Sequence, residues 1–389
     1  TLVRVLVLGQ ADSLPGAVSR GLRAAGLAHL VALSGLHVGL LAGMVALATS
    51  GFRPYLRFSL VVLTVGGYIC LAGARPSLVR ATMMLLAVIG AWLLRRPPRT
   101  TNTLAWVAAG MILLRPVIVR DLGFQLTIAA TAGILVLAPH FERRLAWMPP
   151  TIGQALSVSL GATLAALPWS SSAFHLVSPL SPLWNLLAVP WAGLALALAI
   201  VWVVAASFSD AGARWIGYLL DLIGVPLEML GELPPGVLLP IPIALTWWQG
   251  AAMTAALMGL LMGGRWARTA SAIGLLGLCW MWRHEVPTDP EMIVLDVGQG
   301  DAIVLRDREH AILIDGGGWI RSDIAQRILI PSLSRFGIRR LDAMLMTHPD
   351  VDHCAGLLGL ASFTSVGRFL TASGWYGDPC LVELLGRPG

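Results

Sequence analysis

Long apolar stretches separated by short polar segments fill the first 283 residues of the chain, and then the pattern stops. A helix needs roughly 20 apolar residues to cross a bilayer, and many of these stretches approach that length. The stretch at 215–232 also carries Asp221 and Glu228, so a re-entrant or surface helix is an alternative there. The pattern predicts a polytopic α-helical membrane domain over residues 1–283 with about eight to ten spans. The apolar stretches lie at 29–49, 58–74, 77–94, 103–114, 122–139, 152–168, 181–207, 215–232, 246–262 and 269–282.

The periodicity changes after a linker at 284–291, which contains Pro287, Asp289 and Pro290. Short β-rich runs with glycine turns predict strands at 292–297, 302–307, 310–315 and 341–348. Helical spacing over 322–338 predicts a helix with Ser322 or Asp323 as its cap. Residues 292–389 are therefore expected to form the N-terminal part of a separate α/β domain.

Composition and charge support this division. Hydrophobic residues make up 56% of the chain and charged residues 12%, against about 25% charged in soluble domains. Before His284 there are 18 arginines and 7 acidic residues, and from His284 onward there are 9 and 14, so the net charges are +11 and −5. All 27 basic residues are arginine, which is typical of a GC-rich genome. Since membrane proteins also collect arginine at helix ends, the high pI does not by itself indicate nucleic acid.

Four groups of arginines between the apolar stretches predict the orientation. If every stretch spans, all four groups fall on one side, which the positive-inside rule makes the cytoplasm. The tail would then lie outside, whereas the loss of one span would put it inside. The groups are Arg53 with Arg57, Arg95 with Arg96 and Arg99, Arg143 with Arg144, and Arg265 with Arg268.

The cysteines and the first residue give little information about the fold. Cys70, Cys279, Cys354 and Cys380 form no CxxC pair, so we predict neither a structural zinc nor a disulfide. The chain begins with Thr1 and shows no signal peptide, and we expect a fragment truncated at both ends.

Polar residues inside the apolar stretches are candidates for a path through the membrane. An arginine at mid-bilayer costs roughly 2.5–3.5 kcal/mol on insertion scales, so such residues usually face a bundle interior or water. Hydrogen bonding between helices is the alternative, and an arginine near a helix end can also snorkel. The candidates are Ser34, His37, Arg75, Arg80, Asp121, Gln125 and Asn185.

The densest cluster of candidate metal ligands is His348, Asp350, Asp352 and His353, directly after a predicted buried strand. In extended chain, side chains two apart point the same way, so the first three can converge. Imidazole and carboxylate ligands suit zinc, manganese or similar divalent ions. An acidic surface loop with incidental histidines is the alternative. The stretch "GQGD" (298–301) lacks the lysine of a phosphate loop and predicts a tight turn that brings Asp301 near the cluster.

Four stretches resemble the ComEC family of competence membrane proteins, the inner-membrane channels for transforming DNA. They are "HLVALSGLHVGLLAG" (29–43), "AGARPSLVRATMM" (72–84), "RDLGFQLTIAATAGI" (120–134) and "PLSPLWNLLAVPWAGL" (179–194). The resemblance implies a bacterial inner-membrane channel for single-stranded DNA, with double-stranded DNA outside and other competence proteins as partners. It leaves a homo-oligomer open.

The tail resembles the metallo-β-lactamase fold (αββα), whose HxHxDH signature reads HxDxDH here because Asp350 replaces the second histidine. The terminal domain of the ComEC family carries the same variant, together with "LDVGQGDA" and "LIDGG". The resemblance implies one or two divalent ions, Mn or Zn with Mg as an alternative, held by His348, Asp350, Asp352 and His353. It also implies catalytic roles for Asp352, for Asp315 as a brace of the metal loop, and for Asp296 at the site edge. The tail has about half the length that this fold needs, and we expect it to be incomplete.

Three functions remain open. The first is a DNA channel whose tail is a metal-dependent nuclease that degrades the strand not imported. The second is a DNA channel with a degenerate, non-catalytic tail. The third is a membrane-bound metallo-hydrolase unrelated to DNA. His348, Asp352 and His353 favour the first over the second, and the membrane motifs speak against the third.

Overall fold

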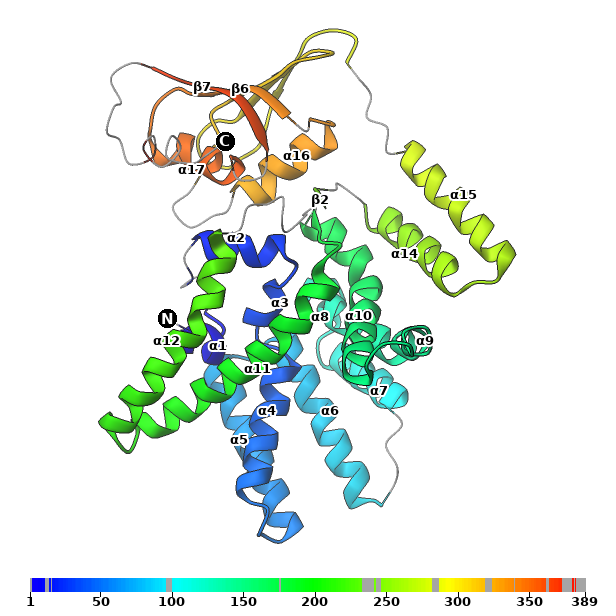
Figure 1. Ribbon diagram of the computed structural model, residues 1–389, viewed down its shortest axis with the longest axis vertical. Helices are drawn as coiled ribbons and strands as arrows, with labels where there is room; N and C mark the ends of the chain where they lie inside the picture. The colour runs from blue at the N-terminus through cyan, green and yellow to red at the C-terminus, as the bar shows by residue number, and fades with distance from the viewer. Residues whose placement is uncertain are drawn as a thin grey trace. The chain divides into compact units, whose positions relative to one another are not determined.

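The computed structural model describes residues 2–10, 14, 16–95, 100–174, 176–232, 241–242, 246–281, 287–318, 324–338, 340–361, 364–372, 380 and 382. Chain contacts divide it into two compact units, one of residues 1–169 and 178–240 and one of residues 170–177 and 241–389. The first unit is helical, and the second contains a helical hairpin and a small sheet (Figure 1). The chain therefore has the expected fold class, a helical part followed by an α/β part.

Most helices between residues 28 and 232 follow the apolar stretches, whereas α1 (Leu2–Leu8), α2 (Gly16–Ala24) and the 3-10 helix η2 (Pro116–Arg120) lie outside them. The other helices of this part are α3 (Ala28–Val31), α4 (Gly35–Ala48), α5 (Pro54–Ala72), α6 (Pro76–Leu93), α7 (Thr100–Leu114), α8 (Leu122–Val136), α9 (Ala138–Arg144), α10 (Pro150–Phe174), α11 (Ser181–Ala206) and α12 (Asp210–Glu232). The apolar stretch 29–49 is interrupted at Ala32–Ser34, where α3 ends and Ser34 caps α4.

Four described helices are long and apolar enough to cross a membrane: α5, α6, α10 and α11. The pair α8 and α9, bent by 42°, would count as a fifth if it is one span. Several other stretches form helices shorter than a bilayer needs, such as α7 and α14 (Trp247–Met262). The chain is a multi-pass membrane protein, and the count of eight to ten spans stays a prediction.

Apolar packing holds the first unit together. Helices α4, α5 and α6 pack against one another around Leu33, Val38, Val65 and Leu78 (Figure 1). Helices α8 and α10 approach so closely at Gly133 and Gly161 that a Cβ on either glycine would collide with the other helix. Small residues at such crossings let helix backbones approach closely, which is the usual way helices associate in lipid.

The second unit contains α14, α15 (Arg265–Met281) and a five-stranded sheet in the order β3-β4-β5-β6-β7. The strands are β3 (Glu291–Val294), β4 (Ile303–Arg306), β5 (Ala311–Ile314), β6 (Arg340–Met346) and β7 (Ser365–Thr371). Strands β3, β4 and β5 are antiparallel, and β5, β6 and β7 are parallel. A two-stranded pair, β1 (Leu176–Val177) with β2 (Ile241–Pro242), also belongs to this unit. The four predicted strands are confirmed with slightly shorter bounds, and β7 was not predicted.

The core of the α/β part lies between the sheet and three helical segments, η3 (Ala325–Leu329), α16 (Ile330–Arg335) and α17 (Val351–Leu360). Its centre is built from fully buried residues of both layers, among them Leu313, Met344, Leu329 and Leu357. The predicted helix over 322–338 is present from Ile324 as a π-helical turn that continues into α16, while Ser322 and Asp323 lie outside the described residues. Pro331 explains the π-helical turn, because its backbone nitrogen carries no hydrogen and cannot donate to the carbonyl four residues earlier.

Candidate functional site

The predicted metal cluster lies where strand β6 ends and helix α17 begins. Strand β6 is largely buried and delivers Thr347 and His348 to the loop, Asp350 is the residue before α17, and Asp352 and His353 lie in its first turn. His348 and Asp350 come together as expected, with 3.4 Å between Nε2 and Oδ2, but the predicted extended chain does not continue to Asp352. A helical residue is rotated by about 100° from its neighbour, so the two-residue alternation of a strand ends at Asp350.

Glycines let α17 lie directly against the segment after β5. The N–H of Gly316 donates to the carbonyl of His353 at 2.8 Å, and the N–H of Gly356 donates to the carbonyl of Gly317 at 3.0 Å. A Cβ on Gly356 would collide with the Gly316 carbonyl oxygen. This close approach brings Asp315 next to the first turn of α17.

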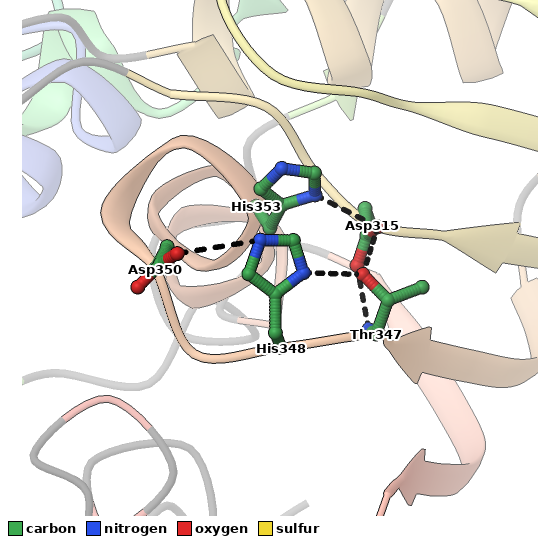
Figure 2. A network of polar contacts seen from close by, with 5 residues as sticks. All are labelled: Asp315, Thr347, His348, Asp350 and His353. Atoms are coloured by element: carbon green, nitrogen blue, oxygen red, sulfur yellow. Dashed lines mark hydrogen bonds and ion pairs between the residues drawn. The ribbon is translucent and has the colours of Figure 1, made fainter.

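Asp315 is the centre of the polar network in Figure 2. It is buried, 2% exposed, and has a positive φ of 55°, which is uncommon for any residue other than glycine. Its Oδ1 accepts from the backbone N–H of Thr347 at 2.8 Å. Its Oδ2 accepts from the Thr347 hydroxyl at 2.6 Å and bonds His353 Nδ1 at 2.9 Å. One carboxylate thus joins the end of β6 to the first turn of α17, in a backbone conformation of the kind that clusters at functional sites.

The same contacts determine which nitrogen of each imidazole carries its proton. Asp315 accepts at Oδ2, so His353 donates from Nδ1 and leaves Nε2 with a free lone pair. The single Thr347 hydroxyl proton goes to Asp315, so the hydroxyl can only accept from His348 Nδ1, 2.9 Å away. His348 Nε2 faces Asp350 Oδ2 at 3.4 Å. Two imidazoles that are each held through Nδ1 match the usual second shell of metal-binding histidines.

The donors fit a divalent ion chemically but are not gathered into a complete site. The two imidazole rings lie 3.8 Å apart between centroids, and Asp350 Oδ2 lies 3.4 Å from His348 Nε2. Two imidazole nitrogens with a carboxylate are ligands that zinc and manganese accept. Asp352 takes no part in the network, and its backbone carbonyl and Cβ lie against Gly300 instead. In the part of the chain that the structure describes, no three His, Cys, Asp or Glu side chains are grouped to hold a metal ion.

The turn 298–301 has the predicted tight geometry, with positive φ at Gly298 and Gly300. Asp296 Oδ1 accepts from the N–H of Gly298 at 3.2 Å, and the Asp301 carbonyl accepts from the N–H of Gly317 at 2.8 Å. Gly300 has no room for a side chain, because Asp352 packs against it. Asp296 and Asp301 thus stabilise the turn beside α17, and the predicted role of Asp296 at the site edge stays a prediction.

The prediction of no disulfide is wrong. Cys354 of α17 and Cys380 are joined by a disulfide, with their Cα atoms 6.6 Å apart. A spacing of 26 residues has no motif that the sequence reveals, because pairing depends on where the fold brings the two side chains. The bond ties the helix that carries Asp352 and His353 to the C-terminal segment.

Ser34 and His37 are both engaged at the start of α4. The two side chains form a reciprocal capping box, in which Ser34 Oγ accepts from Leu36 N–H and the Ser34 N–H donates to His37 Nδ1. His37 Nε2 lies 2.8 Å from the carbonyl of Leu6, and the ring is 2% exposed. These contacts cap α4 and tie it to α1.

The other polar residues of the helices also have local partners. Asp121 caps α8 by accepting from Phe124 N–H, and Gln125 donates to the Val119 carbonyl at 2.9 Å. Asn185 of α11 donates to Ser159 Oγ of α10 at 2.7 Å, while its buried Oδ1 has no hydrogen-bond partner among the residues that the structure describes. The assignment of these residues to a path stays a prediction.

The two arginines of this set lie at the start of α6. Arg75 immediately precedes the helix and donates from Nη2 to the carbonyl of Gly9 at 3.3 Å. Arg80 lies one turn further and donates from Nη1 to Thr131 Oγ1 of α8 at 2.8 Å.

Sequence reasoning missed three partner residues: Thr347, Thr131 and Ser159. The signal for Thr347 was its position between a buried strand and the first histidine. Thr131 and Ser159 had no comparable signal, since hydroxyl residues are frequent in apolar helices and only the packing identifies the partner.

Known families and proteins match nearly the whole chain. A family model described as competence protein matches residues 6–269, and one described as metallo-beta-lactamase superfamily matches residues 295–375. ComE operon protein 3 of Bacillus subtilis (strain 168) is 26% identical over 97% of this chain and 51% of its own length. Competence protein ComA of Neisseria gonorrhoeae is 30% identical over 98% of this chain and 54% of its own length.

A third relative, the uncharacterized protein YcaI of Escherichia coli (strain K12), is 29% identical over 90% of this chain and 49% of its own length. The chain thus spans about half the length of these curated relatives. No solved structure matches it.

Proposed function

Because this chain belongs to the competence protein family, we propose that its helices form a channel for single-stranded transforming DNA in the inner membrane of a bacterium. We further propose that the α/β part is a metal-dependent nuclease that degrades the strand not imported. The observation that supports both is the presence, in one chain, of the competence match over 6–269 and the metallo-beta-lactamase match over 295–375. Other competence proteins would deliver double-stranded DNA to it.

The proposed nuclease chemistry depends on His348, Asp350, Asp352 and His353 as metal ligands. Divalent metal bound by these residues would activate water and stabilise charge on the phosphodiester. The chain's own contribution is orientation: Asp315 holds His353 directly and His348 through Thr347, so that both rings are fixed through Nδ1.

Deletion and complementation in a transformable host test the channel. Uptake of labelled DNA should be lost in the deletion strain and restored by the full-length protein. Normal uptake in the deletion strain would instead favour the membrane-bound hydrolase unrelated to DNA.

Two substitutions in the full-length protein test the nuclease. His353→Ala should abolish metal-dependent DNA cleavage while DNA uptake into the cell persists. Asp350→His should keep cleavage and shift the preferred ion from manganese toward zinc, because imidazole is the softer ligand. Unchanged metal preference would mean that Asp350 is not a ligand.

The second candidate is the same channel with a non-catalytic tail. The observation that favours it is that the described residues include no three ligands grouped for a metal. Cleavage by the wild-type protein that requires added Mn²⁺ or Zn²⁺ would exclude this candidate.

The proposed location of the α/β part is outside the cytoplasmic membrane. The arginine groups favour it by the positive-inside rule. The Cys354–Cys380 disulfide supports it independently, because disulfides persist in oxidising compartments and are rare in the bacterial cytoplasm.

A further inference from the structure

Two arginines lie on either side of the junction between α3 and α4. A Cβ on Gly9 would lie 3.1 Å from Arg75 Nη1 and would also touch the Leu33 side chain. A Cβ on Gly35 would lie 3.5 Å from Arg80 Nη2. Ser77, between the two arginines on α6, donates to the carbonyl of Leu33. The end of α1, the junction Leu33–Gly35, the start of α6 and the middle of α8 therefore meet around the two guanidinium groups.

Arginines far outnumber acidic residues in this part of the chain, and the acidic residues that flank it are Asp12 and Asp121, of which Asp121 caps α8. Residues 13–120 include eleven arginines and no aspartate or glutamate. The partners of Arg80 are neutral: the Thr131 hydroxyl at 2.8 Å and the Met84 sulfur at 3.5 Å. Thr131 already donates its proton to the Thr127 carbonyl at 2.7 Å, so toward Arg80 it acts only as an acceptor.

Arg80 also keeps unused donors. Its Nε is buried and has no hydrogen-bond partner among the described residues. A half-buried guanidinium among apolar helices is costly without a counter-charge, and charged residues inside membrane helices commonly mark the path of a substrate. A bound anion would supply such a counter-charge.

We propose that Arg75 and Arg80 bind neighbouring phosphate groups of a nucleic-acid strand as it passes the Leu33–Gly35 junction. The planar guanidinium has five N–H donors in a fork that matches phosphate oxygens, and contacts to phosphates read no sequence. Thr131 holds Nη1 of Arg80 and so orients the remaining donors. This inference rests on the proposed DNA channel and assigns the residues that would contact the strand's backbone.

Phosphate of a lipid headgroup shares this chemistry, so the experiment must separate the two sources. The full-length protein is purified, and binding of a fluorescent single-stranded oligonucleotide is measured across a range of salt concentrations. A probe of the same sequence with a neutral methylphosphonate backbone is measured beside it. The variants are Arg75→Gln, Arg80→Gln, Arg80→Lys and Thr131→Val, with Arg115→Gln as the control, because Arg115 is exposed and lies outside this cluster.

Each lost phosphate contact should lower the slope of log affinity against log salt by about 0.7, the value for single strands. Arg75→Gln and Arg80→Gln should each show this change and bind about tenfold more weakly at low salt, as loss of a charged hydrogen bond requires. Arg80→Lys and Thr131→Val should bind more weakly with the wild-type slope, since the charge remains. Arg115→Gln should match the wild type, and the neutral probe should not distinguish the variants.

Wild-type slopes in both glutamine variants would overturn the inference and leave the proposed channel standing. Loss of co-purified anionic lipid with unchanged oligonucleotide binding would also overturn it, since the phosphate would then belong to lipid. Failure of the wild-type protein to bind single strands at all would instead contradict the proposed function. If Arg80→Gln does not insert, Arg75→Gln decides the matter, because Arg75 is exposed and precedes the helix.

Discussion

At the scale of single residues, the notable feature of the α/β part is how much depends on Asp315. This one carboxylate contacts the Thr347 backbone, the Thr347 hydroxyl and the His353 ring, and through the hydroxyl it also orients His348. Thr347 is the link that was not anticipated. Thr347 positions a proposed metal ligand. We therefore expect its removal to lower metal affinity more than it lowers the rate of the chemical step.

Thr347→Val keeps the size and branching of the side chain and removes its hydroxyl. Metal affinity of the full-length protein should fall by about 10- to 100-fold, the usual effect of removing such an outer partner. Competition with a chromogenic chelator for Zn²⁺ or Co²⁺ measures it. Thr347→Ser is the matched control and should keep wild-type affinity, while wild-type affinity in the valine variant would show that Thr347 does not position His348.

At the scale of elements, α17 is held by backbone contact with the segment after β5. Gly316 and Gly356 approach so closely that neither has room for a Cβ, and the helix can carry His353 to Asp315 only because of this approach. The hairpin between β4 and β5 is a second element, and the Asp307 side chain caps its turn by accepting from two backbone N–H groups.

Gly356→Ala should destabilise the α/β part by about 1–3 kcal/mol, the usual cost of overpacking. The corresponding fall in the unfolding midpoint is about 5 °C or more for a domain of this size. Gly274→Ala is the matched control, because a Cβ there meets no atom within 4 Å and alanine favours the helix α15. Thermal unfolding of the purified chain measures both, and equal midpoints for the two variants would contradict the close approach.

Asp307 should make the hairpin sensitive to acid. The backbone N–H groups of Glu309 and His310 donate to its Oδ1 and hold the pKa of the carboxyl below its usual 3.8. A depressed pKa in the folded state stabilises the fold above the unfolded pKa, and this contribution disappears as the pH falls through the folded value. Asp307→Ala should therefore lower the unfolding midpoint at pH 7, and its difference from wild type should shrink below about pH 4.

Asp307→Asn provides the control for this titration. It keeps an acceptor for both N–H groups but cannot titrate, so its turn should lose no stability in acid. A difference between wild type and Asp307→Ala that stays constant from pH 7 to pH 3 would show that the charge contributes nothing.

At the scale of the whole molecule, a membrane part and an α/β domain are joined in one chain. The side of the membrane on which the α/β domain lies determines which molecules it can contact. Under the proposed function, the domain would meet incoming double-stranded DNA if it lies outside the membrane and the imported strand if it lies inside. The arginine groups and the Cys354–Cys380 disulfide favour the outer side.

The state of the disulfide in cells tests the orientation. In rapidly quenched cells, Cys354 and Cys380 should resist a thiol-reactive polyethylene glycol until a reductant is added. Cys354→Ser should leave Cys380 reactive without reductant. Two results together would place the domain inside the cell. They are full labelling of both thiols in the untreated wild type, and reporter fusions after Arg283 that are active only in the cytoplasm.

The sequence by itself determined the features that depend on neighbours along the chain. Apolar stretches long enough for helices, strands with period two, and the ligand-rich segment 348–353 are local patterns, and they identified the fold class and the family. The tight turn at 298–301 followed equally well from its glycines. The boundaries depended on capping, so the break at Ser34 inside an apolar stretch was not anticipated.

Only the tertiary structure decided which side chains meet. Asp315 reaches His353 across 38 residues, Arg80 reaches Thr131 across 51, and Cys354 pairs with Cys380 across 26. Such contacts depend on the packing of elements that are remote in sequence, and no local pattern encodes them. Asp352 shows the same limit: it lies between Asp350 and His353 in the sequence, yet a helix begins at Val351, and among the described contacts its side chain takes no part in the network.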